Sequence, residues 1–118
     1  MLALFSYLLL ATTAAVAAPA DELAALLAAA REARESGALE EARDALHRAH
    51  EFVAEPTREV GTDELRSLDA EAGALGVGAT RVLARRALVA RFEQTLPEDS
   101  IDLIQARLDL ANALRSAG

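Results

Sequence analysis

Three glycines, Gly37, Gly78 and Gly118, stand 41 and 40 residues apart, and each follows a helical pattern of apolar residues. Glycine is the commonest residue just past the end of a helix. A fixed period of this length is the signature of helical repeats, in which a pair of helices stacks on the next pair because it cannot bury its apolar face alone. The period therefore predicts an array of helical units.

The residues between these glycines divide into five amphipathic helices. Apolar residues recur every three or four positions, and the segments are separated by glycine, proline and short polar turns. The expected helices cover residues 21–36, 39–54, 62–75, 79–95 and 101–118. No segment alternates polar and apolar residues as a half-buried strand does. We therefore predict an all-α fold in which short turns make consecutive helices antiparallel.

The first turn and the helix after it carry a recognisable packing pattern. Gly37 is suited to a tight turn, and Leu39 is expected to plug the space between the two helices. Ala42 and Ala49 are small enough for helices to approach closely, and Leu46 fills the space between them. This pattern resembles the turn and second helix of a tetratricopeptide repeat.

The last stretch, residues 96–118, is similar to the kinesin-light-chain-type subclass of these repeats. It has an acidic linker containing proline, and Leu110, Ala111, Leu114 and Gly118 match the first helix of that subclass. The resemblance implies a short right-handed α-solenoid over residues 21–118, with an incomplete last repeat. Gly78 would then close the first helix of the middle unit.

The resemblance also implies a function, because tetratricopeptide repeats bind extended peptides in a groove lined by the first helix of each pair. It implies a non-catalytic scaffold with a protein or peptide partner and no cofactor. Asparagine and arginine side chains on a groove wall can hold a peptide backbone or carboxylate by hydrogen bonds. The groove-facing residues would be Leu27, Arg31, Arg34, Leu108, Asn112 and Arg115.

The first twenty residues differ from the rest, because no charged side chain precedes Asp21. A leucine-rich stretch is followed by small residues around Ala17 and Ala18, which is typical of an export signal. We expect residues 1–18 to be a cleaved signal of a periplasmic or secreted protein. An uncleaved membrane anchor is the alternative, although the strongly apolar part is shorter than the ~20 residues that span a bilayer. A wrong start codon or a fragment end is the third possibility.

Composition excludes several classes of chemistry. The chain has no cysteine, so disulfides and thiolate metal sites are impossible, and its net charge of −7 argues against nucleic-acid binding. His47 and His50 share a helix face, with Glu51 beside them. The sequence has no further histidine and no other strong ligand nearby, so we predict a solvated face and no metal. No catalytic pair or triad is recognisable. The arginines of residues 81–91 are expected to form a salt-bridged face, or to meet an acidic partner or lipid headgroups.

The last expected helix is apolar on two sides. One side carries Ile101, Ile104 and Leu108, and the other carries Leu103, Leu110 and Leu114. An exposed apolar face indicates a partner, self-association or a truncated gene product. Two further hypotheses therefore stay open: an N-terminal fragment of a larger signalling protein whose catalytic domain is missing, and an alanine-rich exported bundle without true repeats.

Overall fold

The computed structural model describes residues 19–117, in which five α-helices and no strand are present. The prediction of an all-α fold is confirmed for these residues. The proposed signal or anchor of residues 1–18 and the expected end at Gly118 lie outside them. The helices are α2 (Pro19–Glu35), α3 (Leu39–Ala54), α4 (Thr62–Leu75), α5 (Gly78–Thr95) and α6 (Ile101–Ala117).

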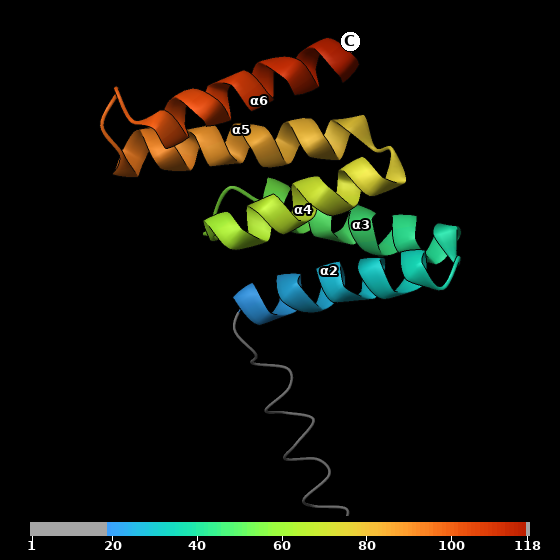
Figure 1. Ribbon diagram of the computed structural model, residues 1–118. Helices are drawn as coiled ribbons and strands as arrows, with labels where there is room; N and C mark the ends of the chain where they lie inside the picture. Colours follow the sequence, from blue (N-terminus) through green and yellow to red (C-terminus); the bar gives the residue numbers. More distant parts are fainter. Residues whose placement is uncertain (1–18, 118) are drawn as a thin grey trace, which may run out of the picture.

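α2 lies at one end of the stack and α6 at the other, and α3 and α4 overlap between α2 and α5 (Figure 1). Consecutive helices form hairpins: α2 packs on α3, α4 packs on α5, and α5 packs on α6. α4 also lies against α2 and α3, so it joins the first hairpin to the second. α4 and α6 have no Cα atoms within 8 Å of each other, although both pack on α5.

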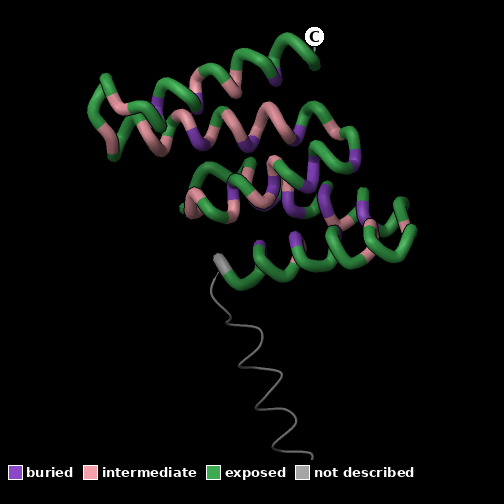
Figure 2. Tube along the Cα trace, in the orientation of Figure 1, coloured by how far each residue is buried: buried purple, intermediate pink, exposed green. Residues whose placement is uncertain are grey.

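The core lies among α2, α3, α4 and α5, where Figure 2 concentrates the buried positions. Leu68 is fully buried there. Ala42, Leu46 and Ala49, which the sequence pattern places between helices, are also buried. α6 contributes less, because it turns only Leu103, Ala106 and Ala113 inward. The core residues are Leu23, Leu27, Ala42, Leu46, Ala49, Phe52, Leu68, Ala72, Leu75 and Ala84.

Two glycines end helices with a left-handed backbone, at φ +84° for Gly37 and +72° for Gly76. After α2, the amide of Ala38 donates to the carbonyl of Ala33 at 2.8 Å; after α4, the amide of Val77 donates to that of Ala72 at 2.9 Å. This pattern satisfies carbonyls that the helix end leaves without partners.

The prediction that Gly78 ends a helix is wrong, because Gly78 is the first residue of α5. The turn glycine of the second hairpin is Gly76, which stands 39 residues after Gly37. The near-constant period of the three glycines therefore does not mark equivalent turns.

We expect Gly37→Ala to destabilise the fold by about 1 kcal/mol, because an L-residue is strained in the left-handed region. Space is no obstacle, since a Cβ at Gly37 would meet nothing within 4 Å. Gly78→Ala is the matched control: its φ is not positive, and its Cβ would make an ordinary 3.6 Å contact with the Cβ of Ala117. Urea unfolding checks both variants, and an equal loss in both would contradict this assignment of the turns.

Three predicted packing residues lie on the surface. Leu39 is 46% exposed. It is the first residue of α3, and helix side chains point toward the N-terminus, which here carries Leu39 past the end of the hairpin. Ala111 and Leu114 are exposed, and Leu110 is half-buried, because α6 turns a different stripe toward α5. The exposed apolar face expected on the last helix is confirmed, and it is formed by Ile101, Ile104, Leu108, Ala111 and Leu114.

Candidate binding crevice

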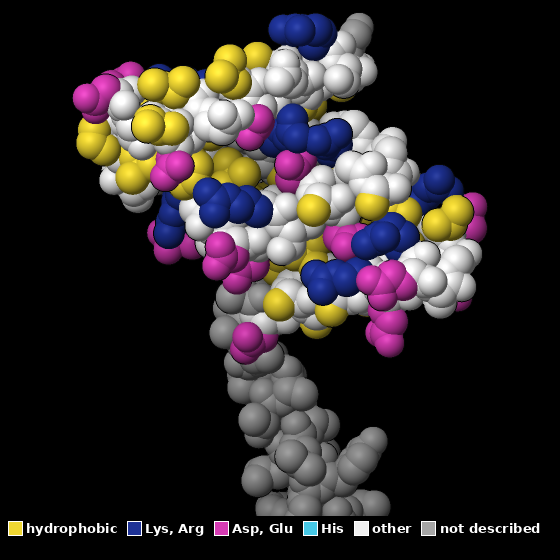
Figure 3. All heavy atoms as spheres, viewed as in Figure 1, with side chains coloured by type: hydrophobic (Ala, Val, Ile, Leu, Met, Phe, Trp, Pro, Cys, Tyr) yellow, Lys and Arg dark blue, Asp and Glu magenta, His cyan; other side chains and the backbone are white. Residues whose placement is uncertain are grey.

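A crevice of about 260 Å³ lies between α4 and α6, and residues of α5 form its floor. It exists because both helices pack on α5 while their backbones stay apart. In Figure 3, hydrophobic atoms are visible on this face between charged side chains of both signs. The crevice is lined by Arg66, Asp69, Arg85, Leu88, Phe92, Asp102, Gln105, Ala106 and Asp109.

The floor of the crevice is apolar. Leu88 and Ala106 are 8% and 7% exposed, and Phe92 is half-buried. The guanidinium carbon of Arg66 lies 5.8 Å from the centre of the Phe92 ring, so the cation faces the ring. An apolar side chain of a ligand could pack on this partly buried floor, with Arg66 at one edge.

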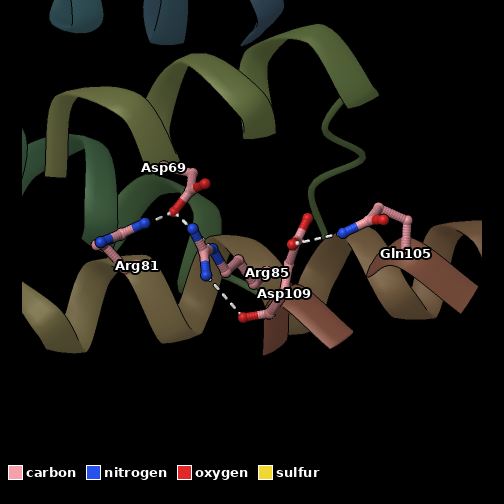
Figure 4. Close-up of polar contacts among 5 residues, drawn as sticks. All are labelled: Asp69, Arg81, Arg85, Gln105 and Asp109. Atoms are coloured by element: carbon pink, nitrogen blue, oxygen red, sulfur yellow. Dashed lines mark hydrogen bonds and ion pairs between the residues drawn. The ribbon is translucent and has the colours of Figure 1, made fainter. Parts of the chain in front are cut away.

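Arg85 ties the two walls of the crevice together (Figure 4). Its Nε donates to Oδ1 of Asp69 on α4 at 3.0 Å, and its Nη1 donates to the main-chain oxygen of Asp109 on α6 at 2.7 Å. Arg81 donates to the same Asp69 oxygen at 3.2 Å. The side chain of Arg85 is only 15% exposed, which favours a fixed geometry for this contact.

The place of these residues follows from the hairpin. Asp69 and Arg85 stand at the same distance from Val77, which lies in the turn between α4 and α5. Residues equally far from a short turn face each other across two antiparallel helices. This symmetry about the turn is a signal in the sequence that could have identified the pair. The expectation of a salt-bridged arginine face is confirmed for Arg81 and Arg85.

The α6 wall is acidic. Asp102 and Asp109 both line the crevice, and Nε2 of Gln105 donates to Oδ1 of Asp109 at 3.0 Å. Because Asp69 is engaged by Arg81 and Arg85, the carboxylates that remain toward a ligand are those of Asp102 and Asp109. The crevice therefore offers an apolar floor, an acidic wall and the guanidinium group of Arg66, a combination suited to binding a ligand.

The arginines predicted to line a groove in the first unit serve a structural contact. Nε and Nη2 of Arg34 donate to the two carboxylate oxygens of Glu71, at 2.9 and 3.1 Å, and Nε of Arg31 lies 3.4 Å from Oε1 of Glu71. Glu71 is 5% exposed and belongs to α4. The bonds from Arg34 hold the pKa of Glu71 below its ordinary value, against the effect of burial. This ion pair joins α2 to α4.

The other groove predictions fall on two separate surfaces. Leu27 is 3% exposed and lies at the base of a second crevice, between α2 and α4, whose rim includes Arg31. Leu108, Asn112 and Arg115 are exposed on α6, and they line neither of these two crevices. The structure does not bring these residues into one groove. Their part in binding stays a prediction.

The two histidines point to different partners. Nε2 of His47 lies 3.1 Å from Oε1 of Glu51, and both side chains are exposed. Nδ1 of His50 instead forms a 2.8 Å hydrogen bond with Oγ1 of Thr80, which is 2% exposed. Burial, and then the charge of His47, lower the pKa of His50. Residues 19–117 contain no group of three or more metal-ligating side chains placed to hold an ion.

The comparisons with known proteins identify no relative. No family model, curated protein or solved structure matches the chain. Among helices α2 to α6, none combines the length and the apolar character that crossing a membrane requires. A function is therefore inferred from the geometry of the crevice.

Proposed function

We propose that the chain is a non-catalytic protein–protein interaction module, exported or tethered to a membrane, that binds an extended peptide in the crevice between α4 and α6. The observation that carries the proposal is the crevice itself. It combines an apolar floor of Leu88 and Phe92 with the two carboxylates of Asp102 and Asp109. Concave ligand-binding sites in proteins are mostly apolar, with a few polar groups that fix the orientation of the ligand.

The ligand expected from this lining is a peptide with one apolar anchor next to a basic residue. The anchor would rest on Leu88 and Phe92, and the basic residue would face Asp102 and Asp109. Arg66, on the opposite wall, would donate hydrogen bonds to a peptide carbonyl or carboxylate. The crevice is fixed by Arg85, so the ordering cost of binding falls mainly on the peptide.

A tetratricopeptide-like array is part of the proposal, and a pattern shared by α2 and α6 supports it. Leu23, Leu27 and Ala30 of α2 are buried. The residues 81 positions later are Ile104, Leu108 and Ala111, which form the exposed stripe of α6. α2 presents its stripe to the core it shares with α3, and no helix among the described residues stands in that place beside α6.

Selection from a random peptide library on the immobilised chain tests the proposal. We expect enrichment of peptides that pair an apolar anchor with lysine or arginine. Asp102→Arg reverses a charge of the α6 wall, and it should weaken the enriched peptides about tenfold or more, because like charges then face each other. Isothermal titration calorimetry measures the change.

Asp63→Arg is the matched control, since Asp63 is an exposed carboxylate that lines the other crevice, between α2 and α4. It should leave the affinity unchanged. If no peptide is enriched, or if Asp63→Arg weakens binding while Asp102→Arg does not, the proposed site is wrong. The second outcome would favour the surface beside Leu27 and Arg31.

A further inference from the structure

The outer face of α6 carries most of the large hydrophobic side chains that are exposed in residues 19–117. Five large hydrophobic side chains are exposed in this part of the chain, and four of them belong to α6; the fifth is Leu39 on α3. Ile101 is 82% exposed and Leu108 is 55% exposed. Figure 3 shows hydrophobic side chains gathered over this helix. Contiguous apolar patches of this kind mark interaction sites.

The stripe is regular enough to pack against another helix. Ile101, Ile104, Leu108 and Ala111 follow one another at intervals of three, four and three residues, which places them along one side of α6. Such spacing forms the seam of two helices that pack side by side. Small Ala111 would let the second helix approach closely near the C-terminal end.

Charge along α6 decides the orientation of that second helix. Glu98 and Asp99 lie just before its first turn, where Glu98 also pairs with Arg107, and Arg115 lies in its last turn. A second α6 that ran parallel would place acid beside acid and Arg115 beside Arg115. An antiparallel α6 places each Arg115 beside the acidic end of the other copy, so the face is complementary to itself in that orientation alone.

We infer that the chain forms an antiparallel homodimer through α6. In this arrangement Ile104 of one copy lies opposite Leu108 of the other, and Ile101 lies opposite Ala111. Each copy contributes the same stripe, as a two-fold axis requires. The crevice stays open, because Asp102, Gln105 and Asp109 lie on the side of α6 that borders it. The dimer does not depend on the proposed peptide binding.

Sedimentation equilibrium of the purified full chain tests the dimer. At about 100 µM, where a contact of micromolar affinity is saturated, we expect twice the mass of one chain. Leu108→Asp should weaken the dimer at least about a hundredfold, because it places a carboxylate within the apolar seam. Leu39→Asp is the matched control, since Leu39 is also exposed but lies on α3, and it should leave the dimer unchanged.

A charge exchange tests the antiparallel orientation. Arg115→Glu and Asp99→Arg should each weaken the dimer about tenfold, and the two together should restore it. Circular dichroism at 222 nm shows that the variants keep their helices. A monomer at this concentration, or a dimer that survives Leu108→Asp, would overturn the inference and assign the face of α6 to another partner. A double variant that fails to restore association would overturn the antiparallel arrangement.

Discussion

Leu68→Ala will destabilise the fold by about 3 kcal/mol, the usual cost of truncating a fully buried leucine. Leu68 is 0% exposed and belongs to α4, the helix that joins the first hairpin to the second. Its truncation leaves a cavity at that junction. A domain of this size has only about 5–15 kcal/mol of stability, so the loss is a large fraction of the whole. Urea unfolding followed by circular dichroism measures it, as a lower midpoint at an unchanged slope.

Leu39→Ala is the control for this variant, because it removes the same atoms from a side chain that is 46% exposed. Its cost should be a small part of the cost at Leu68. Similar losses at the two positions would mean that α4 is not packed into a shared core. An unfolding curve with two transitions in Leu68→Ala would show instead that the hairpins unfold separately.

Glu71→Gln is expected to cost about 2 kcal/mol, since hydrogen bonds to charged groups contribute about 1.5–3 kcal/mol. The amide keeps the size of the side chain, but it can accept only through one oxygen, and it leaves Arg34 without a carboxylate. Arg34 remains about a third exposed, so water replaces part of what is lost. Glu51→Gln is the control, because Glu51 pairs with His47 on the exposed surface of α3 and should matter little.

The effect of Glu71 should depend on pH in a defined direction. Hydrogen bonds from Arg34 lower its pKa in the folded chain, so the unfolded chain binds the proton first as the pH falls. The stabilisation is therefore complete above the ordinary value of 4.5 and is lost as the pH falls below it. The difference between Glu71→Gln and the parent chain should shrink in that range. A constant difference down to about pH 3 would contradict a lowered pKa of Glu71 in the folded chain.

Helix positions were predictable where the sequence has strong punctuation. The second expected helix, residues 39–54, has the bounds of α3, because Gly37 ends the preceding helix and Pro56 follows closely. The second turn was misassigned because glycine occurs at 73, 76 and 78, and only Gly76 takes the left-handed conformation. Which glycine does so depends on where the last turn of α4 packs, and periodicity does not contain that information.

The burial of α6 was beyond what periodicity decides. The helix has two apolar stripes, and either one could have faced the core. Contact with α5 selects Leu103, Ala106 and Ala113, and this choice exposes Ile101 and Leu108. A helix with a single stripe would have left no such ambiguity.

The candidate site was missed for a related reason. The crevice depends on the distance between α4 and α6. These helices are separated in the chain by α5, and no local pattern specifies that distance. The family resemblance led to the prediction that Arg31 and Arg34 line a groove. No local pattern showed that both pair with Glu71, because Glu71 lies on a different helix. Only the pairing of Asp69 with Arg85, placed symmetrically about one turn, was within reach of the sequence.

Nuclear magnetic resonance tests the central claim, which is that the crevice between α4 and α6 binds peptides. A peptide enriched on the chain is titrated into the isotope-labelled protein, and backbone amide shifts are followed by residue. The largest shifts should fall around Asp69, Leu88 and Gln105, which line the crevice. Shifts centred on Leu27 and Arg31, or on the outer face of α6 at Leu108, would contradict the account.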